Sequence, residues 1–131
     1  MTDAYIVGVD MIKFGRFPEK TVPQIGAQAA LMALDDCGLT IQDMQALYCG
    51  NLGQASGMVG QRLLQEIGQT GMPVVNVANA CATGAFFLHA ADASSKSIST
   101  SNLGLICSSF GNASSKSIFS FIICSFCRFK R

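Results

Sequence analysis

Residues 74–90 read VVNVANACATGAFFLHA, and this stretch decides the fold that the sequence predicts. It begins with β-branched residues typical of a strand, continues through small residues that favour a turn, and ends with a run that favours a helix. Cys81 lies in the turn, at the expected start of the helix. The stretch therefore predicts a strand, a turn and a helix of the kind found in α/β proteins.

A helix is expected upstream, over about residues 22–37. Thr21 and Gln24 have the spacing of a capping box, and Pro23 lies in the first turn, where its missing N–H costs nothing. Gly38 follows the last turn, as is typical of a helix C-terminus. The apolar face of this segment predicts ordinary core packing.

The remaining elements extend the same alternation of strand and helix. The run YIVGV at 5–9 is suited to a strand in a sheet covered on both faces, and QALYCGN at 45–51 predicts a second strand. A second helix is expected over about 58–67, ahead of the strand at 74–78. Strands that alternate with helices predict a parallel sheet joined by right-handed crossovers.

The pattern changes after about residue 91. Residues 1–92 hold all eight acidic residues and four basic ones, whereas residues 93–131 hold five basic residues, no acidic residue and twelve of the thirteen serines. The net charge of +1 is a cancellation between these parts, so it indicates no class of partner. The snippet ASSKSI occurs at 93–98 and again at 113–118, without a continuing period.

We therefore expect two regions: a partial domain over 1–91, and an irregular, Ser-rich, basic tail over 92–131 that does not fold independently. A frameshift, a read-through of non-coding sequence or an aberrant splice would each produce such a break. A sheet that loses its later strands exposes an unpaired edge and half its intended core, which predicts low solubility and an association between copies that depends on concentration.

The amino-acid composition indicates which class of protein the sequence belongs to. Of the 131 residues, 50% are apolar and 13% are charged, which predicts one packed core. No signal peptide precedes Tyr5, so the six cysteines are expected to be reduced thiols in a cytoplasmic protein. Apolar runs such as FIIC at 121–124 are far shorter than the roughly 18–20 residues that cross a bilayer, so no membrane span is expected.

Cys81 is the candidate nucleophile. A cysteine at the first turn of a helix lies beside unpaired backbone N–H groups that favour the thiolate, and the same groups can stabilise an oxyanion. Ala80, Ala82 and Gly84 leave little bulk around it, so a substrate carbonyl could approach. The alternative is that Cys81 is a small buried hydrophobic residue, and the spacing leaves both interpretations open.

Other candidate motifs favour structural roles. Cys37 closes a helix and Cys49 lies in a strand, so both are expected in the core. The pair CSFC at 124–127 lacks the further ligands of a zinc site, and GNLGQASGMVG at 50–60 lacks the Lys and Ser/Thr of a P-loop. The terminal RFKR at 128–131 is too short to predict nucleic-acid or lipid binding.

Several ordered motifs together resemble a known family. YIVGVDMIKFGRFPEKTVPQIGAQAALMALDDCGLTIQDMQALYCGN and GQASGMVGQRLLQEIGQTGMPVVNVANACATGAFFLHAA, within about 4–91, resemble the N-terminal part of a thiolase, nearest to the sterol-carrier-protein type of acetyl-CoA acyltransferase. The motif NACATG matches the stretch that holds the family's acyl-accepting cysteine. The resemblance implies that role for Cys81, with Asn79 and Gly84 as supporting residues.

The resemblance also implies an architecture and a chemistry. Thiolases have a layered α/β/α/β/α fold built from two similar halves and work as homo-oligomers. They use acyl-CoA thioesters as substrates, hold no permanent cofactor, and form or cleave a carbon–carbon bond through an acyl-cysteine. As an alternative to a thiolase, the sequence could be a piece of a related condensing enzyme of the ketoacyl-synthase type.

The family's catalytic histidine and second cysteine lie in motifs that this sequence does not contain. The single histidine, His89, follows Cys81 by eight residues, which is about 12 Å along a helix at 1.5 Å per residue. A base must come within about 3 Å of the proton that it takes, or act through one water, so His89 is not expected to be that base. We therefore expect a catalytically incomplete fragment. An active acyltransferase and a non-catalytic binding, dimerising or tail-anchored module are the alternatives.

Overall fold

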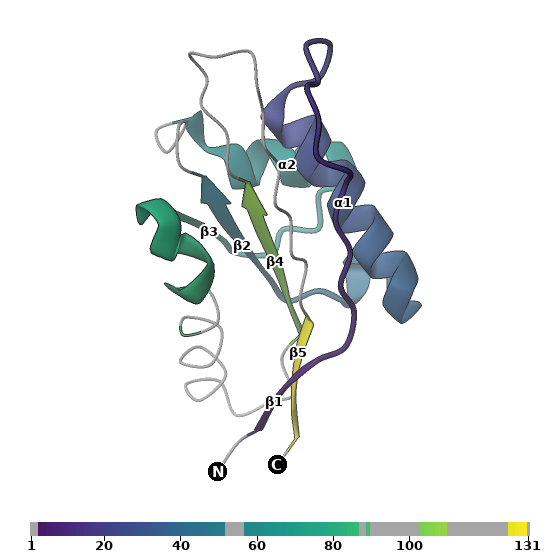
Figure 1. Ribbon diagram of the computed structural model, residues 1–131. Coiled ribbons are helices and arrows are strands. Elements are labelled where there is room, and N and C mark those ends of the chain that lie inside the picture. Colours follow the sequence, from purple (N-terminus) through teal and green to yellow (C-terminus); the bar gives the residue numbers. More distant parts are fainter. Residues whose placement is uncertain (1–2, 52–56, 87–88, 90–102, 110–125, 131) are drawn as a thin grey trace.

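The computed structural model describes residues 3–51, 57–86, 89, 103–109 and 126–130. Five strands form one sheet in the order β1-β5-β4-β2-β3 (Figure 1). The elements are β1 (Asp3–Ile6), α1 (Val22–Cys37), the 3-10 helix η1 (Ile41–Asp43), β2 (Ala46–Asn51), α2 (Val59–Ile67), β3 (Val74–Val77), the 3-10 turn η3 (Ala80–Ala82), β4 (Leu103–Ser109) and β5 (Phe126–Lys130). Residues 83–86 and 89 are helical. The predicted α/β fold is confirmed.

The sheet is mixed, with a parallel centre. β2 pairs in parallel with β3 on one side and with β4 on the other, so that Leu47 lies opposite Val74 and Leu105. β5 runs antiparallel to both β4 and β1. The predicted parallel pairing is confirmed for β2 and β3, which α2 connects.

Helix α1 begins and ends where its sequence predicts. The Thr21 Oγ1 accepts a hydrogen bond from the Gln24 N–H at 3.4 Å, and the Gln24 Oε1 accepts one from the Thr21 N–H at 3.0 Å, which completes the capping box. At the other end, Gly38 adopts a left-handed φ of 66° and its N–H points to the last carbonyls of the helix. The local sequence therefore specifies both ends of this helix.

The core lies between the two helices and one face of the sheet. Side chains of α1 and α2 pack on Leu47 of β2, while Cys49, two residues further along the same face, packs with Val22 and Val59. Burial of each large aliphatic side chain contributes about 1.5–3 kcal/mol. The buried members of the main cluster are Ile12, Ile25, Ala29, Ala30, Ala33, Leu34, Ile41, Met44, Leu47, Leu63 and Leu64.

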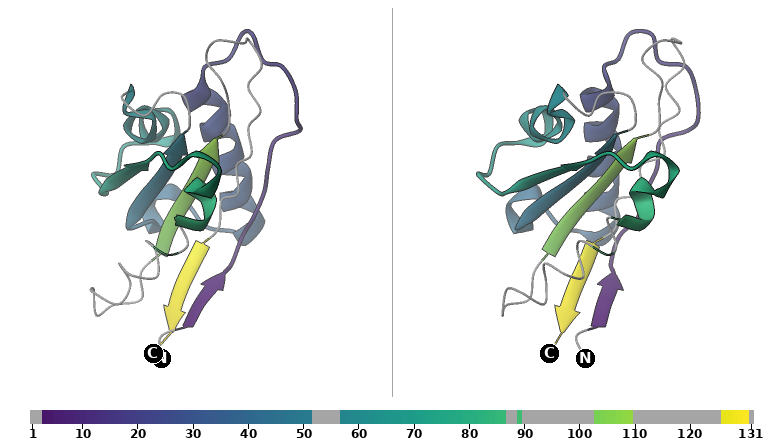
Figure 2. Two further views of the ribbon diagram at one scale, coloured as in Figure 1. Left: turned by 60° about the vertical axis from the view of Figure 1, so that its left-hand side comes forward. Right: turned by 90° about the vertical axis from the view of Figure 1, so that its left-hand side faces the viewer.

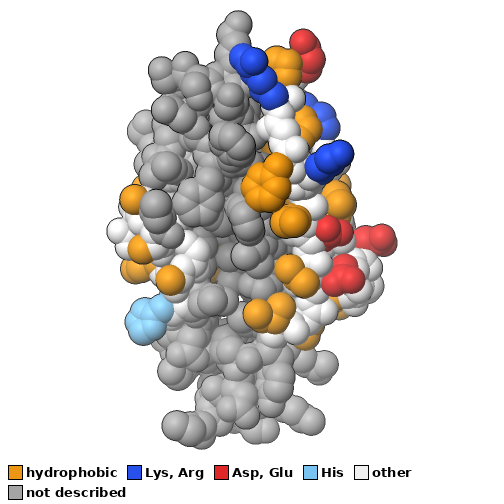
Figure 3. All heavy atoms as spheres, in the orientation of Figure 1, with side chains coloured by type: hydrophobic (Ala, Val, Ile, Leu, Met, Phe, Trp, Pro, Cys, Tyr) orange, Lys and Arg blue, Asp and Glu red, His pale blue; other side chains and the backbone are white. Residues whose placement is uncertain are grey.

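The first strand differs from its prediction. It spans Asp3–Ile6 and not 5–9, and Val7 and Val9 are 39% and 53% exposed, so the expectation of a strand covered on both faces is wrong here. The chain leaves the sheet because it crosses α1: a Cβ on Gly8 would lie 2.8 Å from the Ala33 carbonyl oxygen, and the Val9 N–H donates to the Asp36 carboxylate at 3.0 Å. Hydrophobic side chains consequently lie at the surface of the described part of the molecule (Figure 3).

Two segments of the expected irregular tail are strands. β4 pairs with β2 over six residue positions, and β5 lies between β4 and β1. This differs from the expectation of irregular structure after residue 91, because the short apolar runs in LGLICSS and FCRFK supply strands once a sheet is present to pair with. Both ASSKSI copies lie outside the described residues.

Residues 80–86 lie on the opposite side of the sheet from α1 (Figure 2). Alternation along β2 and β3 directs Leu47, Cys49 and Asn76 toward the helices α1 and α2, and Val75 and Val77 toward the other side. Val75 is exposed there, as is Phe86 in the helical segment. Tyr48, the neighbour of Val75 on β2, is buried on this same face, so the face is covered at β2 and exposed at β3.

Candidate active site at the end of strand β3

The turn that contains Cys81 follows the carboxyl end of β3 directly. β3 ends at Val77, and the 3-10 turn spans Ala80–Ala82 before helical residues begin at Thr83. The Ala82 N–H donates to the Asn79 carbonyl oxygen at 3.0 Å, which closes the turn. The predicted strand, turn and helix are confirmed in this order.

Ala80 has an unusual backbone conformation. Its φ is 43°, in the left-handed region that L-residues with a Cβ rarely occupy. Such a conformation costs an alanine about 1–2 kcal/mol, so surrounding contacts have to hold it. The residue immediately before Cys81 is therefore a strained point in the chain.

Thr83 supplies contacts of this kind. Its side chain is 2% exposed, and its Oγ1 accepts a hydrogen bond from the Asn79 N–H at 3.0 Å and donates one to the Ala80 carbonyl oxygen at 2.7 Å. The Thr83 N–H also points to the Ala80 carbonyl. Thr83 was not among the residues predicted from the sequence, although a hydroxyl residue four positions after an Asn at a helix start is a local signal for backbone capping.

The three predicted site residues lie within six residues of one another, from the start of the turn to the first helical residues. Cys81 is the middle residue of η3, and its side chain lies outside what the structure describes. Asn79 and Gly84 are exposed, and no described atom lies within 4 Å of a Cβ built on Gly84. Gly84 thus leaves open space beside the helical segment.

The sequence around the turn contains no charged side chain. From Gly68 to Leu88, every residue other than Cys81 is apolar, glycine, or a neutral Asn, Gln or Thr. The basic residues Arg16 and Lys20 lie elsewhere, on the segment before α1, where the Lys20 Nζ donates to the Gln28 Oε1 at 2.8 Å and lies 5.9 Å from the centre of the Phe17 ring. Backbone dipoles are therefore the local groups that could stabilise a thiolate at Cys81.

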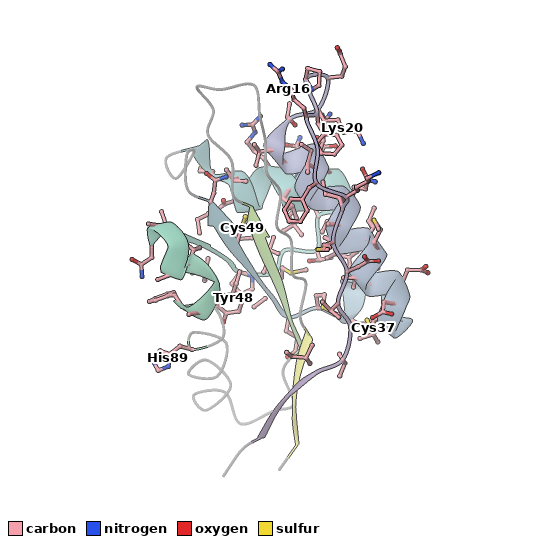
Figure 4. All side chains as sticks on the ribbon, in the orientation of Figure 1. Arg16, Lys20, Cys37, Tyr48, Cys49 and His89 are labelled. Carbon is pink, nitrogen blue, oxygen red and sulfur yellow. The ribbon has the colours of Figure 1, made fainter. Side chains whose placement is uncertain are left out.

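The other predicted roles can be compared with the structure in Figure 4. His89 is exposed, at the far end of the helical segment from Cys81. Cys49 is 2% exposed within the core, and the half-buried Cys37 donates its S–H toward the Ala33 and Leu34 carbonyls, with Sγ–O distances of 3.3 and 3.2 Å. The expected core role is confirmed for Cys49, whereas Cys37 is half-buried and packs against the edge of the core.

The part of the chain that the structure describes offers neither a candidate metal cluster nor a helix suited to crossing a membrane. Within it, no group of three or more His, Cys, Asp or Glu side chains is arranged to hold a metal ion. None of its helices has the length and apolar character that a bilayer crossing requires. Of the pair at 124–127, Cys124 lies outside the described residues, and so does the loop at 52–56.

Known proteins match part of the chain. No family model matches it. Over 83 residues, which are 61% of this chain and 20% of the relative, it is 45% identical to non-specific lipid-transfer protein-like 2 of Caenorhabditis elegans. Over 92 residues, which are 67% of this chain and 24% of the relative, it is 28% identical to an acetyl-CoA acetyltransferase of Methanothermobacter thermautotrophicus. The chain thus spans about a quarter or less of these curated relatives.

The similarity of fold extends further along the chain. The solved structure of AbyA1, a tetronic acid condensing enzyme, matches with a TM-score of 0.65 at 15% identity, over 86% of this chain and 37% of that protein. This share is larger than residues 1–91 alone supply, so the match includes part of the tail. Over this segment the chain therefore partially matches lipid-transfer-protein-like and acetyl-CoA acetyltransferase sequences, and its fold is like that of part of a thiolase-fold condensing enzyme.

Proposed function

We propose that this chain carries the acyl-accepting step of a thiolase-type acyltransferase, with Cys81 as the nucleophile and an acyl-CoA thioester as the substrate. The supporting observation is that NACATG forms a strained, hydrogen-bonded turn directly after a strand of the parallel centre of the sheet. Ligand sites in α/β sheets lie at the carboxyl ends of such strands. The relationship to an acetyl-CoA acetyltransferase supports the choice of substrate.

The proposed step is a thioester exchange. The Cys81 thiolate attacks the carbonyl carbon of the acyl-CoA, a new sulfur–carbon bond forms, and the bond between that carbon and the coenzyme A sulfur breaks. Coenzyme A leaves as a thiolate and takes up a proton from water. Backbone N–H groups at the start of the helical segment would hold the negative oxygen of the tetrahedral intermediate, and no permanently bound cofactor is needed.

Acylation without rapid turnover is the activity that we propose for this chain by itself. The single histidine, His89, is exposed and lies at the other end of the helical segment from Cys81. A thiolate formed at a low rate is sufficient to accept one acyl group, but condensation or thiolysis needs a base that moves protons in each cycle. The chain is therefore expected to be acylated once and to release the acyl group slowly.

A non-catalytic role in association is the second candidate. Among the described strands, β3 pairs with β2 alone, so its other edge is unpaired. An unpaired edge is a template for a strand from another chain, and Val75 and Phe86 expose apolar surface nearby. We propose that copies of this chain associate, in line with the homo-oligomers of the family that the sequence resembles.

Incubation with acetyl-CoA followed by peptide mass spectrometry tests the acylation step. We expect Cys81 to be acetylated faster than the buried Cys49 and the half-buried Cys37, which serve as internal controls. The variant Cys81→Ser should lose this fast phase and keep the slow labelling of the other thiols. Equal acetylation of all three cysteines in the unmodified chain would overturn the proposal.

Turnover is tested separately with acetoacetyl-CoA and coenzyme A. We expect no more acetyl-CoA from the unmodified chain than from Cys81→Ser. Sustained turnover that depends on Cys81 would show that the chain is a complete enzyme, and would contradict the proposal of a single acylation step.

A further inference from the structure

We propose that Thr83 is a positioning residue that holds the Cys81 turn in the conformation needed for acyl transfer. This inference rests on the proposed function. The first observation is the contrast in burial: the Thr83 side chain is 2% exposed, while Asn79, Ala80, Ala82 and Gly84 around it are exposed. A buried hydroxyl is costly unless it is hydrogen-bonded, so the partners of Thr83 indicate why it is there.

Both hydrogen bonds of the hydroxyl go to the backbone just before Cys81. The Thr83 Oγ1 accepts from the Asn79 N–H at 3.0 Å and donates to the Ala80 carbonyl oxygen at 2.7 Å. Thr83 itself lies two residues after Cys81, so these bonds connect the backbone before the cysteine to a side chain that follows it. The bond from the Asn79 N–H resembles the half of a capping box in which a side chain of the first turn accepts from the N-cap backbone, and the other half is absent because the Asn79 side chain makes no cap hydrogen bond.

The two hydrogen bonds of the Thr83 hydroxyl act on Ala80, the strained residue of the turn. Ala80 has a φ of 43°, which a residue with a Cβ keeps only where its surroundings hold it. The carbonyl of Ala80 receives the Thr83 hydroxyl and also faces the Thr83 N–H. Without the hydroxyl, Ala80 can relax toward the ordinary right-handed or extended regions, and the peptide that leads into Cys81 would rotate with it.

Two substitutions separate the hydroxyl from the shape of the side chain. Thr83→Val keeps the branched shape and removes both hydrogen bonds, whereas Thr83→Ser keeps the hydroxyl and loses only a methyl group. A third change tests the mechanism: Ala80→Gly permits a left-handed φ without strain, so it should compensate for Thr83→Val if the hydroxyl acts through Ala80.

The experiment measures alkylation of each cysteine by iodoacetamide, followed by peptide mass spectrometry, across a range of pH in the full chain. In Thr83→Val we expect the Cys81 rate to fall about tenfold, equivalent to about 1.4 kcal/mol, and its pH profile to move to higher pH. Thr83→Ser should remain within about twofold of the unmodified chain. The double variant Ala80→Gly/Thr83→Val should recover most of the lost rate.

The internal controls distinguish failure of this inference from failure of the proposed function. If Cys81 of the unmodified chain reacts no faster than Cys37, the proposed nucleophile fails. If Cys81 is fast but Thr83→Val leaves its rate and pH profile unchanged, the positioning role alone is overturned. Cys49 is 2% exposed, so rapid labelling of Cys49 in Thr83→Val would indicate general opening of the fold and would also overturn the positioning role.

Discussion

Gly60, in the first turn of α2, lies in close contact with the sheet. A Cβ at this position would lie 2.6 Å from Val74 Cγ1, 2.9 Å from Asn76 Oδ1 and 2.9 Å from Cys49 Cβ. Ordinary contacts between carbon atoms are about 3.5–4.0 Å, so Gly60→Ala forces α2 away from β2 and β3 by about 1 Å. We therefore expect this one methyl group to destabilise the fold.

The expected magnitude is a balance of three effects. Overpacking of a tight site costs about 1–3 kcal/mol, and replacing a helical glycine with alanine recovers about 0.5–1 kcal/mol. Movement of the helix also stretches the hydrogen bond from the Gly60 N–H to Asn76 Oδ1, now 2.8 Å, which contributes about 1 kcal/mol. The free energy of unfolding should therefore fall by about 2 kcal/mol.

Urea unfolding followed by circular dichroism measures this change, and Gly84→Ala is the matched control. Gly84 is also helical, but no described atom lies within 4 Å of the place that a Cβ would take there, so alanine at this position should be neutral or stabilise by up to about 1 kcal/mol. A Gly60→Ala chain as stable as the Gly84→Ala chain would refute the argument from close approach.

Repeating Gly60→Ala in a Val74→Ala chain identifies which contact causes the loss of stability. Val74→Ala removes the nearest atom and leaves Cys49 Cβ, which the backbone of β2 fixes in place. The cost of Gly60→Ala should therefore fall in the Val74→Ala background without disappearing, because residues in contact do not behave additively. Since β3 leads directly into the Cys81 turn, Gly60→Ala should also slow acetylation of Cys81, whereas an unchanged acetylation rate would separate the helix packing from the site.

Two further predictions concern charge and association. Hydrogen bonds from the Thr40 hydroxyl (2.7 Å) and, to a smaller extent, the Thr40 N–H (2.8 Å) lower the pKa of Asp43. The ionised carboxylate therefore stabilises the fold at pH values above the ordinary pKa of about 3.9. This contribution is lost as the pH falls through the lowered pKa. Asp43→Asn should accordingly be less stable than the unmodified chain at pH 7, with a difference in urea midpoint that shrinks as the pH is lowered below the ordinary carboxyl range; a difference independent of pH would contradict the assignment. The edge of β3 that is unpaired among the described strands predicts a sedimentation coefficient that rises with protein concentration. Exposed strand edges associate at concentrations of about 100 μM, so a single monomeric species up to that concentration would contradict the prediction.

Local chemistry made α1 predictable to the residue. Thr21, Gln24 and Gly38 act on backbone groups within a few residues of themselves, so their effect does not depend on the rest of the fold. The strand at β3 and the turn at Cys81 were also predictable, because composition changes there from β-branched to small residues. The first strand was less so, since its end is set by the crossing of Gly8 over α1, a contact between distant segments.

Two features of the site could not be predicted for physical reasons. A left-handed backbone is signalled in sequence by glycine or asparagine, and Ala80 is neither. The burial of Thr83 depends on how the helical segment lies on the sheet, and a threonine between Ala82 and Gly84 gives no sign of it. The position of the turn could therefore be predicted, and the spacing of Asn79 and Thr83 signalled a backbone cap, but the strain at Ala80 and the burial of Thr83 could not be foreseen.

Strand β4, in the tail, shows that a segment can occupy a position in the sheet without sequence similarity to the relatives. β4 pairs with β2 in register, residue for residue from Ala46 opposite Gly104 to Asn51 opposite Ser109, because a central position needs only a short apolar run that can form a parallel ladder. This explains why the match to a condensing-enzyme structure covers more of the chain than the sequence relatives do. The chemistry that we propose has stricter requirements, since it would depend on Cys81, the strained Ala80 and the buried Thr83 hydroxyl in a single turn. The segment at 79–83 is consequently where substitution should change function while the sheet persists.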